Sequence, residues 1–334
     1  MIGWGSGYGK LLLFGEHAAV HGHPALGLAL PMEAQAWMGD DPPQQSLHPE
    51  SRPFEVGDWE IHGMLPRHHA IFRQLWEQLL TQIPQIRNRM NVAVTRRQVA
   101  ITSTVPYEMG FGSSGALSAA LAQAGSRYIG TEASADWLWQ TANTLETVFH
   151  GTPSGIDTGL AVFGGCQAFN RPVEWDRQDL PRRMPLPAPP VMLLIGCIPR
   201  RSSTRDLVEL VHRRLQEEPG RTGDLLTELG TYAAAIIQYL ERGQATPRLF
   251  GHYADEAQQA LRSLGVSTPE LEHVFDRLAD CGSLGGKLSG AGGGGAFYAV
   301  FDDRNRMQEA AEALDNDLAR TYGKGNYYVQ SLCH

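Results

Sequence analysis

Residues 282–295 constrain the fold of this chain more than any other part of its sequence. They read GSLGGKLSGAGGGG, with eight glycines in fourteen positions. Placing these glycines in a helix would cost about 1 kcal/mol each relative to alanine, roughly 8 kcal/mol in total, so a helix is excluded. An apolar run follows at once and further elements come after it. We therefore interpret the segment as backbone that closely approaches a ligand or a neighbouring element, with a flexible linker as the alternative.

A second glycine-rich segment, GFGSSG over residues 110–115, stands between a strand-like run and a helix-like run of small residues. Glycines let backbone N–H groups approach an anion, and a helix N-terminus adds about half a positive charge. Ser113 and Ser114 add hydroxyl groups that suit phosphate oxygens or a magnesium ion. The segment also matches the dinucleotide pattern GxGxxG, but that reading needs an acidic residue about twenty positions further on, and only Glu132 approximates it. A tight turn before a packed helix remains an alternative.

The composition indicates a folded chain that does not bind polyanions over a broad surface. The 334 residues suit about two domains, and a hydrophobic fraction of 42% is ample for a core. The net charge is −8, and no run of lysine and arginine exceeds two residues.

The four cysteines are far apart and form no CxxC pair, which disfavours a disulfide framework or a structural zinc site. No signal peptide or membrane-length apolar run is present, so we expect a soluble cytoplasmic protein.

The alternation of apolar and polar residues predicts a mixed α+β chain. The expected elements, in chain order, are strands and turns over 1–30, an exposed loop or hairpin over 38–58, a helix over 68–82, a strand or hairpin over 92–105, helices over 116–128 and 134–150, a short helix starting at Thr152-Pro153, a buried strand over 191–198, amphipathic helices between 203 and 281, a strand over 296–301, a helix over 304–322 and a strand over 327–332. Prolines cluster between 170 and 190, and we place the domain boundary there, giving domains 1–185 and 186–334.

Two further segments each contain an isolated polar residue that has two possible roles. Lys10, in GKLLLFGEH, follows a glycine and precedes an apolar run, so it is either solvated or an active-site cation. Asp157, in HGTPSGID, stands among small and apolar residues, as a helix-terminus residue or as a buried catalytic carboxylate. The histidines near Glu16 suggest metal ligands, but HExxH is absent and no second cluster completes a site. The sequence also lacks the patterns GxxxxGK[ST], GxSxG and HRD/DFG. These absences exclude a P-loop NTPase, a hydrolase and a protein kinase as interpretations.

Together and in this order, the segments resemble the motifs of the GHMP small-molecule kinases. GYGKLLLFGEHAAVHG is similar to PGKxxLxGEHxVxxG, PYEMGFGSSGA from Pro106 to PxxxGLGSSAA, and KLSGAGGGGA from Lys287 to KLTGAGGGGC. The matches run from residue 9 to residue 295, most of the chain. Tyr8, Gly115 and Ala296 replace a proline, an alanine and a cysteine of the family pattern, and leave the chemical groups in place.

This resemblance implies a two-domain fold, with a ribosomal-protein-S5-like N-terminal domain and a ferredoxin-like C-terminal domain. ATP and a small alcohol would lie between them, with Mg²⁺ bound to the nucleotide, and the γ-phosphoryl group would pass to the alcohol. Homodimers are common in the family, so a homodimer is expected. We expect neither a nucleic acid nor a membrane as a partner.

The resemblance also implies a role for individual residues. Asp157 would take the hydroxyl proton, and Lys10, paired with it, would stabilise charge at the attacking oxygen. The spacing of Glu146, eleven residues before Asp157, matches that between the family's metal ligand and base. The implied set comprises the catalytic residues Asp157 and Lys10, the nucleotide-binding residues Gly110, Gly112, Ser113, Ser114, Gly115, Gly290, Gly292 and Gly293, the metal ligands Ser114 and Glu146, and the substrate-binding residues Glu16, His17 and Thr204.

The identity of the alcohol stays open at this point. The segment PRRSSTR, with Arg200, Arg201 and Arg205, could bind an extra phosphate on the substrate, or could cover the start of a helix at the surface. Another small alcohol, a sugar or a phosphorylated intermediate is therefore an alternative substrate. A catalytically silent sensor of the same fold is a further alternative, although silent homologues should tend to lose the lysine or the aspartate.

Overall fold

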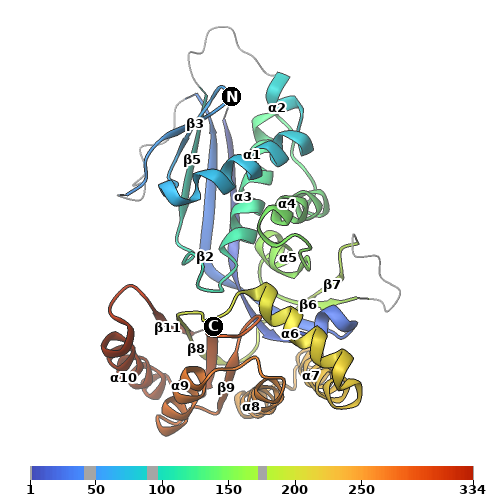
Figure 1. Cartoon of the computed structure of the whole chain (residues 1–334), viewed down its shortest axis with the longest axis vertical. Coiled ribbons are helices and arrows are strands. Elements are labelled where there is room, and N and C mark those ends of the chain that lie inside the picture. Colours follow the sequence, from blue (N-terminus) through green and yellow to red (C-terminus); the bar gives the residue numbers. More distant parts are fainter. Residues whose placement is uncertain (1, 41–49, 89–96, 172–178, 334) are drawn as a thin grey trace.

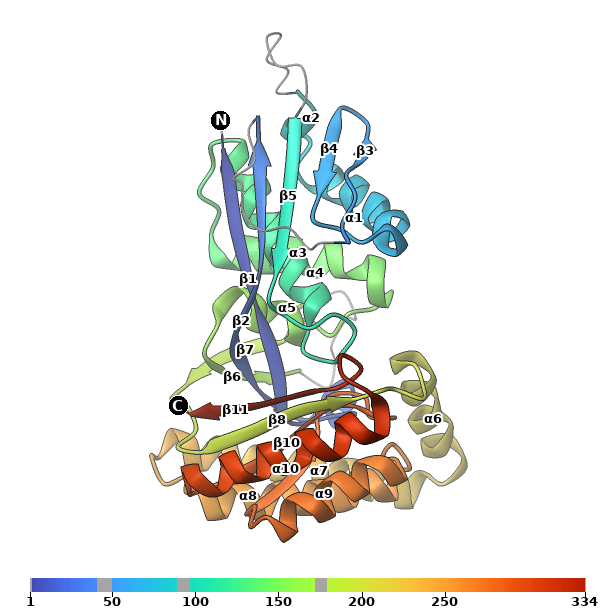
Figure 2. The same ribbon diagram turned by 90° about the vertical axis from the view of Figure 1, so that its left-hand side faces the viewer.

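The computed structural model describes residues 2–40, 50–88, 97–171 and 179–333, and these form two β-sheets with helices packed against them (Figure 1). The first half of the chain builds a seven-stranded sheet, and the second half builds a four-stranded sheet. The two halves lie one above the other along the long axis of the molecule (Figures 1 and 2). The predicted α+β class is confirmed.

The first sheet has the order β3-β4-β5-β2-β6-β7, with β1 paired to β2 outside that path. Only β4 and β5 run parallel among its pairs. Its strands are β1 Gly3–Phe14, β2 Ala25–Gly39, β3 Phe54–Val56, β4 Trp59–His62, β5 Arg97–Ser103, β6 Cys166–Asn170 and β7 Arg182–Leu186. The helices of this half are η1 Ala18–His21, η2 Pro66–His68, α1 His69–Gln82, α2 Gln85–Asn88, α3 Ser113–Tyr128, α4 Ala135–His150 and α5 Ile156–Phe163.

Alternate glycines in β1 let α3 pack directly on the strand. A Cβ atom at Gly3, Gly5 or Gly7 would lie within 3 Å of the backbone of α3. The start of α3 is thereby held beside the middle of β1, where the N–H of Lys10 donates to the carbonyl of Phe111 at 2.8 Å. The sequence predicts short strands and turns in this region. It is one 12-residue strand, because the glycines serve helix packing and do not mark turns.

The second sheet has the order β11-β8-β10-β9, and all its pairs are antiparallel. Numbered along the chain, this order is 4-1-3-2 with helices after the first and third strands, the β-α-β-β-α-β arrangement of ferredoxin-like domains. Figure 2 shows α8, α9 and α10 on the side of this sheet that faces away from the first sheet. The elements are β8 Met192–Ile198, α6 Thr204–Glu217, α7 Pro219–Glu241, α8 Pro247–Ser263, α9 Pro269–Asp280, β9 Gly285–Leu288, β10 Gly295–Phe301, α10 Arg304–Tyr322 and β11 Tyr328–Cys333.

One apolar core joins the two halves. Leu11, Leu13 and Phe14, at the end of β1, belong to the same buried cluster as the strands of the second sheet. The ring of Phe14 packs edge-on against Phe250 of α8, with 5.2 Å between ring centroids. The predicted boundary at 185/186 falls inside β7, one residue before this last strand of the first sheet ends, and the division into domains stays a prediction. The end of β1 therefore packs against the second half of the chain together with residues of β2 and β6.

Several local predictions agree with the structure. The helices predicted over 68–82, 134–150 and 304–322 are α1, α4 and α10, and Ser134 caps α4 by accepting from the N–H of Trp137. The strands predicted over 191–198, 296–301 and 327–332 are β8, β10 and β11. Within the strand or hairpin predicted over 92–105, β5 begins at Arg97, and residues 92–96 lie outside the described part of the chain.

Other local predictions are wrong. The short helix α5 begins at Ile156 and not at Thr152-Pro153, because Gly155 takes a left-handed conformation with φ +78° as its N-cap. Within 38–58, residues 41–49 lie outside the described residues. The predicted hairpin is present there, since β3 pairs antiparallel with β4, but it is not wholly exposed, because the side chains of Phe54 and Val56 are buried in the core. The glycine-dense segment also contains a strand, β9.

Two general features of the described residues concern thiols and membranes. Cys166, Cys197 and Cys281 carry free thiols. In the described ranges, every helix is too short or too polar to cross a membrane.

Candidate active site

Lys10 and Asp157 form an ion pair where the first strand passes the start of α5. Lys10 Nζ lies 3.2 Å from Asp157 Oδ1. The lysine side chain is 8% exposed, whereas the aspartate side chain is 32% exposed. The aspartate therefore keeps one side open to a small molecule while the lysine is held inside the protein. Gly115 of α3 packs against the aspartate, where an added Cβ would lie 3.4 Å from Asp157 Cβ.

The glycine-rich segment 110–115 forms the turn into α3 beside this pair. Gly110 and Gly112 have φ of +90° and +75°, in the left-handed region that favours glycine. A Cβ on Gly112 would also lie 2.6 Å from Lys10 Cγ. Ser113 is the first residue of α3, and its N-cap Gly112 has no side chain to cap the first N–H groups. Such a helix start suits an anion, because its N–H groups and dipole both favour negative charge.

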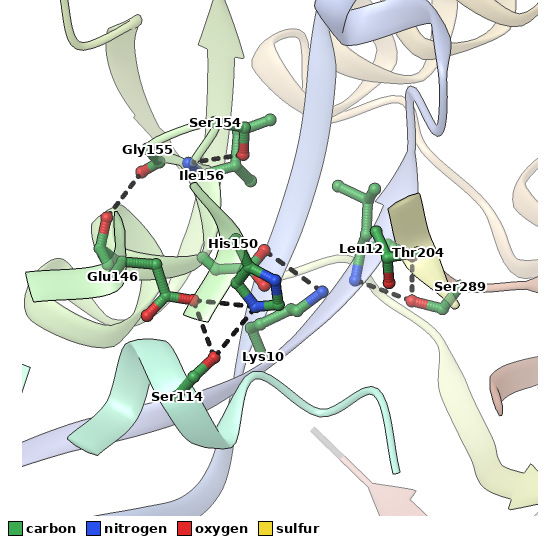
Figure 3. A network of polar contacts seen from close by, with 12 residues as sticks. Lys10, Leu12, Ser114, Glu146, His150, Ser154, Gly155, Ile156, Thr204 and Ser289 are labelled. Carbon is green, nitrogen blue, oxygen red and sulfur yellow. Dashed lines mark hydrogen bonds and ion pairs between the residues drawn. The ribbon is translucent and has the colours of Figure 1, made fainter. Parts of the chain in front are cut away.

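A cluster of polar side chains lies next to this turn, between α3 and α4 (Figure 3). Ser114 Oγ donates to Glu146 Oε1 at 2.7 Å, and Ser118 Oγ donates to Glu146 Oε2 at 3.4 Å. His150 Nε2 is 3.3 Å from Glu146 Oε1 and 3.3 Å from Ser114 Oγ. The predicted metal ligands Ser114 and Glu146 are therefore in direct contact.

Glu146 is a carboxyl group of the site whose pKa is strongly perturbed. Burial, together with the negative charge of Asp157, raises the pKa of Glu146 to about 8. The hydrogen bonds from Ser114 and Ser118 act in the opposite direction. A buried carboxyl group in this position favours a cation beside it.

This environment fits a magnesium ion that is shared with a nucleotide. The described residues contain no group of three or more His, Cys, Asp or Glu side chains that could hold a metal. Mg²⁺ does not require such a group, since it is usually bound by one or two carboxylates together with substrate phosphates and water. Ser114 and Glu146 provide that kind of partial site.

His150 is a site residue that the sequence analysis missed. Burial lowers its pKa, and the charge of Asp157 opposes that effect, while Lys10 and Arg200 add to it. The histidine lies four residues after Glu146 on α4, one turn along the same face of the helix. That spacing is the signal in the sequence that could have identified it.

Arg200 reaches this turn from the second half of the chain. Its Nη1 donates to Thr204 Oγ1 at 3.3 Å, at the start of α6. A Cβ on Gly110 would lie 3.0 Å from Arg200 Nη2, so the guanidinium group lies against the glycine-rich turn. Arg201, in contrast, pairs with Glu270. Of the three arginines in PRRSSTR, Arg200 is the one that lies at the site.

The glycine-rich segment 282–295 approaches protein backbone at most of the positions that were predicted to bind the nucleotide. Gly290, Gly292 and Gly293 have φ of +88°, +86° and +69°. The N–H of Gly293 donates to the carbonyl of Val266 at 2.8 Å, and its carbonyl accepts from the N–H of Arg201 at 2.8 Å. A Cβ on Gly290, however, would meet nothing within 4 Å. Gly290 is therefore the position in this set with free space beside it.

Glu16 and His17 lie deeper than the predicted substrate contacts would require. The carboxylate of Glu16 is fully buried in an ion pair with Lys287 of β9. His17 is 9% exposed, and its Nε2 lies 3.0 Å from the carbonyl oxygen of Ala291. The structure thus brings Lys10, Asp157 and the Ser114–Glu146 pair together, and it turns Glu16 into the protein interior.

Comparison with known proteins gives the class to which this site belongs. The family model "GHMP kinases N terminal domain" matches residues 74–165, and "GHMP kinases C terminal" matches residues 236–320, together just over half of the chain. The chain belongs to the GHMP kinases and is a small-molecule kinase. The predicted family and its two-domain fold are therefore confirmed.

Several individual proteins and solved structures are similar to this chain over most of its length. The mevalonate kinase of Pyrococcus horikoshii is 27% identical over 320 residues, which are 91% of this chain and 90% of that protein. The mevalonate kinase of Aeropyrum pernix is 28% identical over 310 residues, 88% of this chain and 87% of that protein. Among solved structures, L. major mevalonate kinase in complex with R-mevalonate has a TM-score of 0.74 at 21% identity, over 99% of this chain and 95% of that chain. Streptococcus pneumoniae phosphomevalonate kinase has a TM-score of 0.70 at 16% identity, over 98% of this chain and 99% of that chain.

Proposed function

We propose that this protein transfers the γ-phosphoryl group of ATP to the C5 hydroxyl of mevalonate, giving 5-phosphomevalonate, a step of isoprenoid precursor synthesis. The Lys10–Asp157 ion pair beside the glycine-rich helix start carries the proposal, because it sets a proton acceptor and a cation next to a phosphate-binding turn. The choice of mevalonate is supported by relatives of that name, which match about nine-tenths of this chain.

Phosphoryl transfer relies mainly on positioning and charge stabilisation. In the proposed mechanism, Asp157 accepts the proton of the attacking hydroxyl through its exposed side. Lys10, 3.2 Å away, stabilises the negative charge that develops on the attacking oxygen and orients the aspartate. Because the lysine is almost fully buried, its charge acts with little screening by solvent.

The remaining residues would bind the nucleotide. The N–H groups of residues 110–114 would cradle the phosphates, and the backbone of Gly290 would approach them on the side where a Cβ would meet nothing within 4 Å. Ser114 and Glu146 would hold Mg²⁺, which neutralises phosphate charge when it is bound. His150 would orient Glu146, and Thr204 would orient both Arg200 and the substrate.

A second candidate substrate is an alcohol that already carries a phosphate, such as 5-phosphomevalonate. The position of Arg200 against Gly110 favours it, because a guanidinium group binds phosphate with two parallel hydrogen bonds. The same arginine could equally contact a phosphate of ATP, so its position alone does not choose between the substrates.

The experiment that separates these candidates is a coupled ADP-release assay with Mg-ATP and four alcohols. These are mevalonate, 5-phosphomevalonate, galactose and homoserine, with Asp157→Asn as the matched control for background ATP hydrolysis. Turnover that is selective for mevalonate and lost in the variant supports the proposal. Selective turnover of another alcohol replaces the substrate, and ATP binding without turnover of any of them favours a silent sensor of this fold.

The family resemblance adds two proposals on assembly and location. We expect a homodimer in solution, and sedimentation equilibrium at several protein concentrations tests it. We also expect a cytoplasmic enzyme, which fractionation of the producing cells tests directly. A monomer at all concentrations, or recovery with the membrane fraction, would contradict these expectations.

A further inference from the structure

Two segments from opposite ends of the chain meet in the interior between the two sheets. The hydroxyl of Ser289 accepts from the N–H of Leu12 at 3.0 Å and donates to the carbonyl of the same residue at 2.9 Å, as an added strand would (Figure 3). The hydroxyl of Tyr298 donates to the carbonyl of Leu13 at 2.7 Å. The end of β1 is therefore bound to the second sheet by polar contacts as well as by its apolar side chains.

The ion pair of Glu16 and Lys287 lies at the centre of this contact. Both side chains are fully buried, and Lys287 Nζ also donates to the carbonyl of Leu288 at 2.7 Å. The ammonium group lies 5.8 Å from the ring centre of Phe14 and 5.4 Å from that of Tyr298. Glu16 Oε2 accepts no hydrogen bond from the described residues.

Each member of the pair depends on the other for its charge. Burial raises the pKa of Glu16 and lowers the pKa of Lys287, and the charge of the partner opposes both effects. A fully buried ion pair of this kind is a poor source of stability, because desolvation offsets the attraction between the charges. Losing one partner is nevertheless costly, since a buried charge is left without compensation. Such a pair is better suited to fixing geometry than to adding stability.

The pair stands between two parts of the proposed site. Lys10 lies six residues before Glu16 on the same chain segment, and Gly290 lies three residues after Lys287. His17 extends the contact, because its Nε2 lies 3.0 Å from the carbonyl oxygen of Ala291, next to Gly290. His17 also has φ of +57°, unusual for a residue other than glycine, so the local backbone is held in place by these contacts.

We propose that Glu16 is a positioning residue whose ion pair with Lys287 fixes the strand carrying Lys10 against the segment carrying Gly290. It acts on phosphoryl transfer through this geometry and does not contact the alcohol. Lys287, from the other half of the chain, has the same role. The kinetic consequences rest on the proposed function, whereas the coupling between the two residues does not.

The first test measures thermal unfolding of Glu16→Gln, Lys287→Met and the double variant in the full chain. Each single variant should lower Tm by roughly 5–10 °C, because one buried charge loses its partner. The double variant should recover to within roughly 3 °C of the wild type, because neither charge remains. Losses that add up in the double variant would overturn the pairing. This test needs no substrate, so it stands even if mevalonate is not turned over.

The second test measures the kinetics of the same variants with the alcohol that the wild type phosphorylates. All three should lower kcat about tenfold and leave the KM of the alcohol within about twofold, because the pair positions Lys10 and Gly290 and binds nothing itself. The double variant should keep the low kcat although its Tm is recovered, which a merely stabilising pair would not do. A selective rise in the KM of the alcohol in Glu16→Gln, with Lys287→Met unchanged, would instead make Glu16 a substrate contact and overturn the proposal.

Two further variants keep the test decisive. Asp317→Asn removes a partner of Arg277 in an ion pair between α9 and α10, at 3.1 Å, and should leave kcat unchanged. If the single variants at the buried pair do not fold, Ser289→Ala replaces them, because it removes only the hydroxyl that joins Leu12 to the second sheet. It should lower kcat severalfold at constant KM. A wild-type kcat in Ser289→Ala would count against positioning through this contact.

Discussion

Lys10 Nζ lies 3.2 Å from Asp157 Oδ1, and both residues stand in regular secondary structure. The lysine stands on the strand β1, and the aspartate stands in the first turn of α5. Both elements pack against α3, whose start carries the glycine-rich turn. The relative position of the proposed proton acceptor, its paired cation and the proposed phosphate-binding backbone is therefore set by one helix.

Replacing Asp157 with asparagine should lower kcat by at least about 10²-fold, since the amide cannot accept the hydroxyl proton. The side chain keeps its size, so nucleotide binding should change little. Steady-state kinetics together with equilibrium binding of a fluorescent ATP analogue provide both values. A kcat near that of the wild type would exclude Asp157 as the proton acceptor.

Replacing Lys10 with methionine should lower kcat to a similar extent and leave an intact fold. Methionine keeps most of the aliphatic volume of the buried lysine stem but removes the charge next to Asp157. The comparison of kcat with Tm is the informative measurement. If only Tm falls, the ion pair is structural, and the proposed charge stabilisation at the attacking oxygen is wrong.

The raised pKa of Glu146 predicts that the stability of the metal-free protein depends on pH. Its pKa is raised from 4.5 to about 8 in the folded protein, so between these values the native state binds a proton that the unfolded state does not. The contribution of this group to the free energy of unfolding is present at low pH and is lost as pH rises through about 8. In EDTA, the Tm of the wild type should therefore fall by roughly 5 °C relative to that of Glu146→Gln between pH 5.5 and pH 8.5.

The same variant also tests the metal site. Glu146→Gln should raise the concentration of Mg²⁺ needed for half-maximal activity, and Ser114→Ala should do so to a smaller extent, since a hydroxyl is a weaker ligand than a carboxylate. Magnesium titrations at saturating ATP measure both. An unchanged titration curve in Glu146→Gln would remove this residue from the metal site, even if the pH effect on Tm is found.

Much of the candidate site could be predicted from the sequence, because its parts are local. The turn into α3 needs positive φ, and only glycine adopts it without strain, so residues 110–115 mark it directly. Glu146 and Asp157 follow on consecutive helices, at a separation that the family motifs share. In the same way, apolar periodicity predicted α1, α4 and α10 almost to the residue.

The contacts that the sequence did not predict join distant segments. Glu16 and Lys287 are 271 residues apart, and no periodicity in either segment indicates that they pair. The position of Arg200 against Gly110 likewise depends on how the second sheet packs under the first. The prediction of short strands and turns in place of β1 was wrong for a different reason. A strand face made of glycine has no apolar pattern to detect.

Replacing Arg200 with methionine should lower kcat/KM by about 10- to 100-fold, because the guanidinium group that lies against the glycine-rich turn is lost. Arg205→Met is the matched control, since Arg205 is exposed on α6 and should leave kcat/KM unchanged. The KM that rises, that of ATP or that of the alcohol, identifies the molecule that Arg200 contacts. A rise in the KM of ATP places Arg200 on the nucleotide, and a rise in the KM of the alcohol alone places it on the substrate. Equal activity of the two variants would contradict either role.

Gly112 links the conformation of the turn to the position of Lys10, the proposed catalytic lysine, and Gly112→Ala should therefore disturb both. The added methyl group would lie 2.6 Å from Lys10 Cγ, and φ of +75° strains any residue with a Cβ. Gly223→Ala is the matched control, because a Cβ there meets nothing within 4 Å and alanine favours the helix α7. We expect a loss of at least about tenfold in kcat for Gly112→Ala, a weaker affinity for ATP, and a Tm for Gly223→Ala at or above that of the wild type. Unchanged kcat in Gly112→Ala would mean that the turn can move away from Lys10, so that the strand and not the glycine-rich turn fixes the lysine.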